Sequence, residues 1–402
     1  AGKKYIGGIA GYNGTTVDES GALTDKSGMI RNYALAGGYI SGECFAGGYV
    51  GLNTTEKLLG EEALLLSKPN EVTADYFAGG VMGALILVPG SDVRVSCGTD
   101  NFFGKVEANN AFAGGYVAYT QLLASGGSDA ADARAEALYQ ALTEEEISGN
   151  IDINSGRRQE ALQTLAEKVL DDGRNTNNDS AFRLNFIYGG NQGENRFASI
   201  KAPIFAGGII GFNSWNTTLN LQGISNKVQV EATESVVYPF ISKEQGETFS
   251  FAGGVIRLVT PKATVDNCKN INGGGVTGKG TFTGGIAEVN LGEIRNCTAG
   301  SIGGQSNYGG IAGLNTNEGR IAGCTLDGQI SGESYLGGIV VRNESIIEGC
   351  KVKNSAGAGE SAVIGSGEYI GGIAAVSRLK KMGDTEAVYQ NQIKDCLVEA
   401  NI

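Results

Sequence analysis

Asparagine and cysteine are the residue types whose spacing in this chain is regular enough to indicate a defined role. Six asparagines each stand five residues after the second glycine of a Gly-Gly pair: Asn13, Asn53, Asn213, Asn290, Asn315 and Asn343. Five cysteines also follow such pairs, four of them at 12 or 14 residues and one at 24: Cys268, Cys297, Cys324, Cys350 and Cys396. Asparagine tolerates left-handed turns and bonds to nearby backbone or to another asparagine. We therefore expect both sets to form structural ladders between stacked repeats.

The cysteines could be paired, metal-bound or free. The chain has seven, an odd number, and contains no Cys-x-x-Cys, which excludes a zinc knuckle or a thioredoxin-like motif. Cysteines in successive stacked repeats would lie roughly 5 Å apart, within the Cα range for a disulfide. Because a free cysteine also packs well as a small hydrophobe, we expect buried thiols.

Side chains for acid–base or nucleophilic catalysis are scarce. Histidine is absent, which removes the commonest general base and metal ligand. The remaining charged candidates fall in or beside predicted helices, where we expect solvated surface charges: Asp171–Asp172, Glu144–Glu146, Arg157, Arg158 and Lys168. We therefore predict no enzyme, no catalytic residues, and no residues that bind a cofactor or a metal.

One glycine-rich segment partly resembles a phosphate-binding loop. GGGVTGKGT at residues 273–281 lacks the Gly-x4-Gly-Lys-Ser/Thr spacing of a phosphate loop and has no helix after it. It predicts a turn.

The overall composition narrows the class of protein. Glycine supplies 65 of 402 residues and proline only five, while apolar residues make up 41% and charged residues 18%, which suits a packed core. The net charge of −12, without a basic cluster, argues against nucleic acid. The most apolar stretch, Tyr76–Val88, has 13 residues, whereas a membrane span needs about 20. We expect no span and no signal peptide in this segment.

A repeated motif positions the asparagines and cysteines. An aromatic residue, a Gly-Gly pair and an apolar run recur ten times, with second glycines at 8, 48, 80, 115, 208, 254, 285, 310, 338 and 372. The intervals run from 25 to 46 residues, apart from one of 93. The motif predicts a short strand followed by a turn, and stacked copies can bury a face that one copy cannot.

These repeats predict an all-β parallel β-helix, a solenoid of about ten glycine-rich coils. At the interstrand spacing, ten coils would form a rod of roughly 50 Å. A β-propeller needs longer repeats, and the leucine-rich and calcium-binding nonapeptide consensus patterns are missing.

Two insertions divide the predicted solenoid. We expect coils over residues 1–119 with a short insertion at 56–74, a helical insertion at 120–203, and further coils of the same solenoid over 204–402. Apolar residues at helical spacing predict helices at Asp129–Glu146 and Arg157–Leu170, forming a hairpin. This hairpin either covers an exposed side of the sheets or forms a binding face.

The units Gly-Gly-Ile-Ala-Gly-x-Asn and Ile-x-Asn-Cys-x3-Gly resemble the GLUG repeat, with the closest copies at Gly284–Gly300 and Gly309–Gly328. GLUG repeats occur in large surface and secreted bacterial proteins, including non-catalytic regions of some immunoglobulin A peptidases. The resemblance covers nearly the whole chain outside 120–203 and 56–74, although Arg257 stands where glycine is usual. It implies a surface β-helix and transfers no catalytic residues.

The expected function is a non-enzymatic structural or adhesive module of a bacterial cell-surface or secreted protein. Its expected partner is a host or neighbouring-cell glycan or protein, with no nucleic acid and no membrane span. Two alternatives stay open: a carbohydrate-active β-helix enzyme (polysaccharide lyase or glycosidase), and a subunit that self-associates end to end into a fibre. The aromatic residue before each Gly-Gly pair either stacks at a corner of the core or faces outwards as a sugar-binding stripe.

Overall fold

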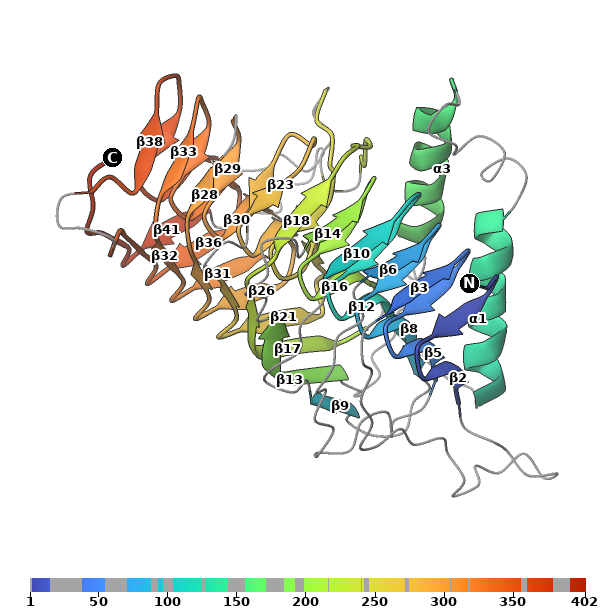
Figure 1. Ribbon diagram of the computed structural model, residues 1–402. Helices are drawn as coiled ribbons and strands as arrows, with labels where there is room; N and C mark the ends of the chain where they lie inside the picture. The colour runs from blue at the N-terminus through green and yellow to red at the C-terminus, as the bar shows by residue number, and fades with distance from the viewer. Residues whose placement is uncertain are drawn as a thin grey trace, which may run out of the picture.

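The structure is a computed structural model. It describes residues 2–14, 38–54, 71–87, 93–96, 104–123, 128–143, 156–170, 184–191, 199–215, 217–239, 241, 246–271, 275–303, 306–316, 319–355, 360–378 and 391–402. The chain is mainly β, with its strands in parallel sheets, as the sequence predicts. Figure 1 shows the strands lying one behind another along the molecule, from the N-terminal to the C-terminal end.

The Gly-Gly pairs lie in a ten-stranded sheet to which each repeat contributes one short strand. Its order is β1 (Tyr5–Gly7), β4 (Phe45–Gly47), β7 (Phe77–Gly79), β11 (Phe112–Gly114), β15 (Ala206–Gly207), β19 (Ala252–Gly253), β24 (Thr283–Gly284), β29 (Tyr308–Gly309), β34 (Leu336–Gly337) and β39 (Ile370–Gly371).

The apolar run after each Gly-Gly pair forms a second strand. These strands make two five-stranded sheets. One contains β2 (Ala10–Asn13), β5 (Val50–Asn53), β8 (Met82–Leu87), β12 (Val117–Leu122) and β16 (Ile210–Asn213). The other contains β20 (Leu258–Val259), β25 (Ala287–Asn290), β30 (Ala312–Asn315), β35 (Val340–Asn343) and β40 (Ala374–Ser377).

The remaining strands form three further sheets. Six strands pair as β3 (Tyr39–Gly42), β6 (Glu71–Ala74), β10 (Lys105–Ala108), β14 (Ser199–Ala202), β18 (Gln229–Ala232) and β23 (Val276–Thr277). Three pair as β28 (Ile302–Gly303), β33 (Ile330–Gly332) and β38 (Val363–Gly365). The thirteen-stranded sheet contains β9 (Val93–Ser96), β13 (Leu184–Asn191), β17 (Leu219–Asn226), β21 (Ala263–Asp266), β22 (Lys269–Asn270), β26 (Glu293–Arg295), β27 (Thr298–Ala299), β31 (Arg320–Ala322), β32 (Thr325–Asp327), β36 (Ile346–Glu348), β37 (Lys351–Lys353), β41 (Gln392–Lys394) and β42 (Leu397–Val398).

The chain returns to the ten-stranded sheet once per repeat and pairs there with the repeat before it. After β24 it passes through β25, β26, β27 and β28, and then re-enters the ten-stranded sheet as β29. The pairs are parallel and equivalent residues face each other: Phe77 pairs with Phe112, Asn290 with Asn315, and Ile321 with Ile347. Like residues therefore meet between repeats, which is what permits ladders.

Glycine is required in the Gly-Gly pair because backbones approach too closely for a side chain. A Cβ built on Gly114 would lie 1.9 Å from the carbonyl oxygen of Val117, and one built on Gly254 would lie 2.1 Å from that of Gly285 in the next repeat. Both distances are far inside van der Waals contact, so this corner of each repeat accepts no larger residue without moving backbone.

The residue before each ladder cysteine is in the left-handed region. Its φ is 50° at Asn267, 53° at Asn296, 61° at Gly323, 60° at Gly349 and 54° at Asp395. Asparagine, glycine and aspartate are the residue types that adopt this conformation at least cost. The residue types at this position therefore follow from a fixed turn between the two strands that flank it.

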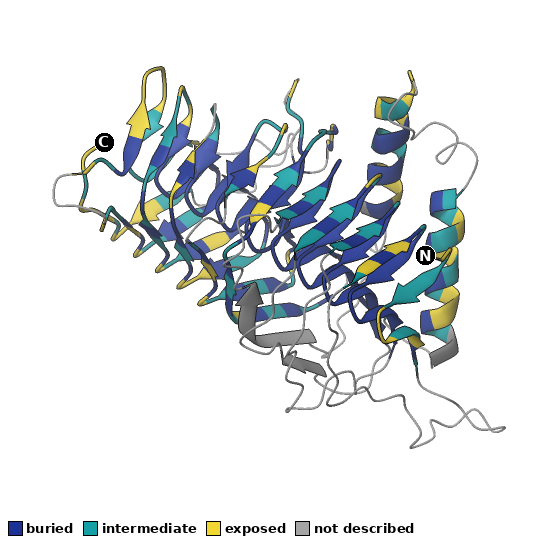
Figure 2. Cartoon of the chain, viewed as in Figure 1, coloured by how far each residue is buried: buried dark blue, intermediate teal, exposed yellow. Residues whose placement is uncertain are grey.

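Two hydrophobic cores lie on opposite sides of the ten-stranded sheet. The first draws one apolar row from each main sheet, for example Ala113, Val117, Val106 and Ile321, and so fills the space between the sheets. The second begins at the aromatic residues on the other face, including Phe112, and continues into the helices. Figure 2 shows buried residues in most strands, with intermediate and exposed residues between them and more exposed ones towards the C-terminal end.

Two helices among the described residues cover the second core. They are α1 (Ser128–Thr143) and α3 (Arg158–Leu170), close to the ranges that the sequence predicts. Their apolar faces are buried in the second core, and α1 lies against β8. No described helix is both long and apolar enough to cross a membrane.

The predicted insertions also contribute strands. Within 120–203, β13 pairs with β17 and β14 pairs with β10 and β18. Within 56–74, β6 pairs with β3 and β10, while 55–70 lies outside the described residues.

The left-handed turn gives a test of the repeat geometry. Asn296→Val places a β-branched residue at a φ of 53° and should lower the free energy of unfolding by about 1–2 kcal/mol. Asn296→Gly should cost less, because glycine adopts this φ freely. Urea unfolding followed by circular dichroism measures both; equal losses would contradict the assignment of strain to the turn.

Candidate functional site

The six predicted asparagines form hydrogen-bonded rows in part. Asn13 Nδ2 donates to Asn53 Oδ1 at 2.8 Å. Asn290 donates to Asn315 and Asn315 to Asn343, each at 2.8 Å. Asn343 donates to a residue outside the predicted set, Asn391, at 2.7 Å.

Asn213 lies apart from the other five. It accepts a hydrogen bond from Thr120 Oγ1 at 2.9 Å and donates to Thr260 Oγ1 at 3.1 Å. Leu85 pairs with Asn53 and with Thr120, and it interrupts the row because it has no polar side chain. The row therefore consists of three separate polar segments along the molecule.

A second asparagine pair was not predicted. Asn226 Nδ2 donates to Asn270 Oδ1 at 2.9 Å, and Asn270 Nδ2 donates to the carbonyl oxygen of Gly285 at 2.8 Å. Both side chains are buried. The sequence offered one sign of this pair, since Asn270 stands two residues after Cys268. Asn226 follows no repeat motif that would have aligned it with Asn270.

The predicted cysteines lie in one column within the first core. Cys268, Cys297, Cys324 and Cys350 are buried free thiols, while Cys396 is partly buried and also free. Cys297 Sγ donates 3.4 Å to the carbonyl oxygen of Val265 in the previous repeat. Burial raises the pKa of the Cys297 thiol well above its usual range. The Cys297 thiol is therefore a poor nucleophile, because its reactive thiolate is disfavoured.

The aromatic residues before the Gly-Gly pairs stack in a column within the second core. Ring centroids lie 4.8 Å apart for Phe45 and Phe77, and 4.7 Å apart both for Phe77 with Phe112 and for Phe112 with Phe205. All four rings are fully buried, which favours corner stacking here over an outward sugar stripe.

The C-terminal part of the column is different. Tyr335 and Tyr369 stack at 4.6 Å but are 37% and 52% exposed. The aromatic residue is thus more exposed in the last two repeats, and in the repeat before them Asn307 holds the equivalent position while Tyr308 packs in the first core.

A fully buried arginine, Arg257, interrupts the second core. Its guanidinium carbon lies 4.4 Å from the ring centre of Phe205 and 4.1 Å from that of Phe212. None of its three side-chain nitrogens has a hydrogen-bond partner. Burial lowers its pKa well below the usual value. Cation–π contact with the rings is the main compensation that the geometry offers.

Glu288 lies one repeat further along from Arg257 and is also fully buried. It accepts hydrogen bonds from Ser250 N at 3.2 Å, Ser250 Oγ at 3.0 Å and Ala252 N at 2.8 Å. Burial outweighs these bonds and raises the pKa of Glu288 to about 8. The carboxyl group ties residues 250–252 to the next repeat.

A buried ion network continues the polar layer. Arg342 pairs with Glu247, with 3.1 Å between Nη2 and Oε2, and with Glu344 at 2.9 Å. Thr316 Oγ1 donates to Glu344 at 2.6 Å. Glu247 lies in the segment that covers the second core, where Val236 and Phe249 form an antiparallel bridge. Its ion pair with Arg342 therefore helps to hold this segment in place.

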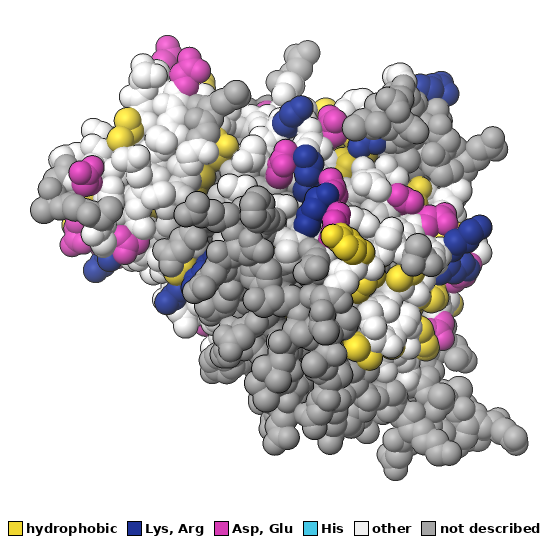
Figure 3. All heavy atoms as spheres, viewed as in Figure 1, with side chains coloured by type: hydrophobic (Ala, Val, Ile, Leu, Met, Phe, Trp, Pro, Cys, Tyr) yellow, Lys and Arg dark blue, Asp and Glu magenta, His cyan; other side chains and the backbone are white. Residues whose placement is uncertain are grey.

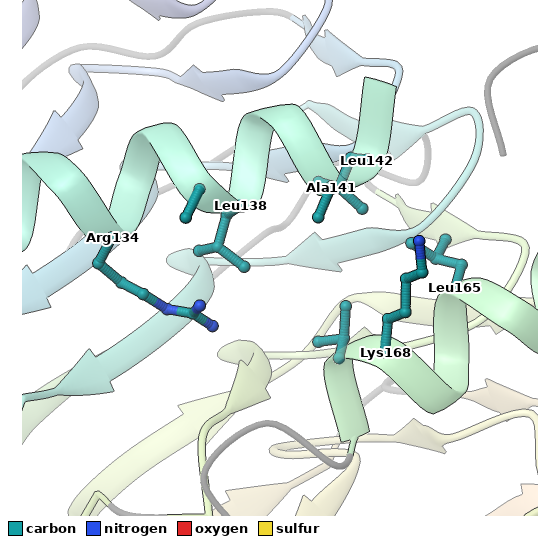
Figure 4. A pocket seen from close by; sticks show the side chains of 8 residues that line it. Arg134, Leu138, Ala141, Leu142, Leu165 and Lys168 are labelled. Atoms are coloured by element: carbon teal, nitrogen blue, oxygen red, sulfur yellow. The ribbon is translucent and has the colours of Figure 1, made fainter. Parts of the chain in front are cut away.

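The two helices enclose a small slot, shown in Figure 4, with a volume of about 70 Å³. Its walls are mainly apolar and include Leu138, Leu142, Leu165 and Val169. One cation from each helix also lines it, Arg134 from α1 and Lys168 from α3. Arg134 Nε donates to Gln121 Oε1 at 2.8 Å, and Tyr119 OH donates to the same oxygen at 2.8 Å.

The remaining sequence candidates do not form a site in the described part of the chain. Val276–Thr277 of the glycine-rich segment is a strand, β23, and Lys279 is exposed. Arg157 pairs with Glu160, and Arg158 Nη2 donates to Asn109 O. The acidic pairs at 144–146 and 171–172 lie outside the described residues. Among the residues that are described, no cluster of three or more metal-ligating side chains occurs.

The asparagine row gives a stability test. Asn315→Ala removes the hydrogen bonds to Asn290, Asn343 and the carbonyl oxygen of Ile346, and Asn290 Nδ2 and Asn343 Oδ1 each lose one of their partners in a buried position. The expected loss is about 2–4 kcal/mol in the free energy of unfolding. Lys351→Ala, at an exposed position of β37, is the control and should change it by less than about 0.5 kcal/mol. Similar losses in the two variants would contradict a stabilising row.

Glu288 gives a pH test. Its folded-state pKa of about 8 exceeds the usual 4.5, so its stabilising contribution is complete below pH 4.5 and is lost as the pH rises through 8. Wild-type stability should therefore fall over this window by up to about 1.4 kcal/mol per pH unit relative to Glu288→Gln. Unfolding at several pH values measures the difference, with Glu293→Gln as a more exposed control. Parallel profiles for wild type and Glu288→Gln would contradict the raised pKa.

Comparison with known proteins supplies no relative from which a role could be transferred. The chain matches no family model, no curated protein and no solved structure.

Proposed function

We propose that this chain is a parallel β-helix that serves as a non-enzymatic structural and adhesive module of a bacterial cell-surface or secreted protein. The observation that carries the proposal is the residue-for-residue pairing of successive repeats, in which Phe45 meets Phe77, Asn290 meets Asn315 and Ile294 meets Ile321. In such pairing the regular side chains hold neighbouring repeats together, so the loops and outer faces are left for contact with partners.

The outer face of the thirteen-stranded sheet supports a scaffold role. Charges there alternate across neighbouring strands and neutralise each other, as in the pairs Arg295–Asp266, Arg320–Glu293 and Lys394–Glu348. A continuous ion network of this kind protects a regular surface from nonspecific pairing. It provides neither the concentrated charge that steers a substrate nor a converging set of catalytic groups.

The outer face of the six-stranded sheet has the same character. Lys105 lies 3.3 Å from Glu71, and Lys201 lies 3.4 Å from Glu231. Figure 3 shows Lys and Arg side chains interleaved with Asp and Glu side chains on the visible face. The described part of this face therefore suits a stable, well-solvated surface.

The GLUG resemblance agrees with this proposal. The Gly-Gly corner, the asparagine turn and the apolar-x-Asn-Cys unit coincide with close backbone approach, hydrogen-bonded side-chain rows and a left-handed turn. Each part of the repeated sequence thus has a structural reason to recur. The proposed partner is a glycan or a protein on a host or neighbouring cell.

The experiment is to couple the chain to beads and measure retention on arrays of mucin-type and plant glycans and of extracellular-matrix proteins. The same preparation is incubated with polysaccharides and assayed for new reducing ends and unsaturated products. We expect saturable retention on a subset of surfaces and no turnover. Beads carrying the urea-unfolded chain are the control.

Two results would contradict the proposal. Catalytic release of product would establish an enzyme, and retention equal to that of the unfolded control would remove the adhesive role. Scattering in solution tests the fold independently, because ten stacked repeats should form a body about 50 Å long.

A further inference from the structure

We propose that the hollow between α1 and the first repeat binds a trimethylammonium group, as carried by choline. This inference concerns α1 and the strands beside it, and it does not depend on whether the chain is adhesive. Figure 1 shows α1 next to the N-terminal strands. The hollow has a volume of about 480 Å³, within the usual range for a small-molecule site. Its lining comes from β1, β2 and α1: Tyr5, Tyr12, Asp132, Ala133 and Glu136.

The two tyrosines give the hollow a pair of aromatic walls. Their ring centroids lie 6.2 Å apart and their planes are tilted by 44°. Tyr5 stacks on Phe45 of the next repeat at 5.6 Å and also lines the hollow, while Tyr12 is 40% exposed. An aromatic face attracts a cation through its negative π system. Two rings set at an angle therefore suit a rounded cation that contacts both.

One carboxylate in the hollow has no positively charged partner. Asp132 is exposed and accepts a hydrogen bond from Tyr12 OH at 2.7 Å. In the described part of the chain, no Lys or Arg pairs with Asp132. Glu136 differs, because Lys4 Nζ lies 2.7 Å from its Oε2 and balances its charge. Asp132 therefore leaves the hollow with negative charge that a cationic ligand would meet.

The same region shows how a primary ammonium is held. Lys4 Nζ lies 4.6 Å from the centre of the Tyr139 ring and also donates to both carboxylate oxygens of Glu136. An ammonium is strongly hydrated and carries three N–H donors that need acceptors. The rings of Tyr5 and Tyr12 offer π faces, which suit a quaternary ammonium because it has no N–H donor to satisfy. Charge and surface together select a trimethylammonium group over an anion or a primary amine.

The experiment is titration of the intact chain with choline, followed by ligand-observed NMR. The matched neutral probe is 3,3-dimethyl-1-butanol, which has the same shape with carbon in place of nitrogen. We expect saturable binding of choline in the millimolar range, as suits so small a ligand, and about tenfold weaker binding of the alcohol. Equal binding of the two probes, or no binding of choline, would overturn the proposal.

Variants test the location. Asp132→Asn keeps an oxygen that accepts from Tyr12 OH but removes the charge, and it should weaken choline binding by about three- to tenfold. Ala133→Arg, at an exposed helical position, should abolish binding because it fills the hollow and repels a cation.

The matched control is Asp395→Asn, the same change at an exposed position in the last repeat. Its φ of 54° also suits asparagine, so this variant should bind choline as wild type does. Circular dichroism shows whether each variant is folded. Unchanged binding in folded Asp132→Asn and Ala133→Arg would place the cation elsewhere and overturn the proposal.

A final comparison distinguishes two sources of the trimethylammonium group. Phosphorylcholine mimics a headgroup, and choline mimics a free solute. Tighter binding of phosphorylcholine supports capture of a headgroup, whereas tighter binding of choline supports a site for a free ammonium compound. Either order supports the trimethylammonium site, provided that the neutral alcohol binds more weakly than both.

Discussion

The close approach of backbones at the Gly-Gly corner is the constraint on which the rest of the structure depends. The Cα hydrogen of Gly254 faces the carbonyl oxygen of Gly285, where a Cβ would lie at 2.1 Å, and Gly285 stands in the same relation to Gly310. Because the backbones approach so closely, successive repeats can stack on one another in register. That register brings phenylalanine onto phenylalanine and asparagine onto asparagine, so the ladders are a consequence of the corner.

The ten-stranded sheet is unusual in that it separates two cores. Its inward alanines pack among branched residues from the other sheets, while its corner aromatics pack outside against α1, α3 and the segment that contains Val236 and Tyr238. The helices are thus part of the folded body and not appendages, because Leu138 and Leu165 are buried in that outer core. This arrangement also explains why a charged residue such as Arg257 can be fully enclosed: it lies beneath the covering segment, between the aromatic rings.

The sequence predicted those features that depend on local pattern. The Gly-Gly strands, the parallel sheets and both helices follow from motifs within a few residues or turns, and the structure has them. It did not predict which residues complete a row when the motif changes. Thr120, Thr260 and Asn391 take polar positions beside Asn213 and Asn343 because of where the backbone passes, which no spacing rule encodes.

The slot was missed for a related reason. Arg134 and Lys168 are 34 residues apart on separate helices, and each reads alone as a surface charge. Only the packing of both helices against the same aromatic column brings them to one place. The buried state of Glu288 was equally out of reach, since it depends on Ser250 and Ala252 from the preceding repeat.

The in-register corner has a consequence for how a chain of this kind can change in length. The segments that end at Gly310 and Gly338 pass through the ten-stranded sheet in the same register. They present nearly the same surfaces to the repeats on either side. Duplicating or deleting one whole repeat would therefore preserve the contacts on either side, whereas an insertion of arbitrary length would not unless it left the sheets as a loop. Recombination at the glycine corner would therefore lengthen or shorten the chain with little loss of packing between repeats. New segments would be confined to the connections between strands.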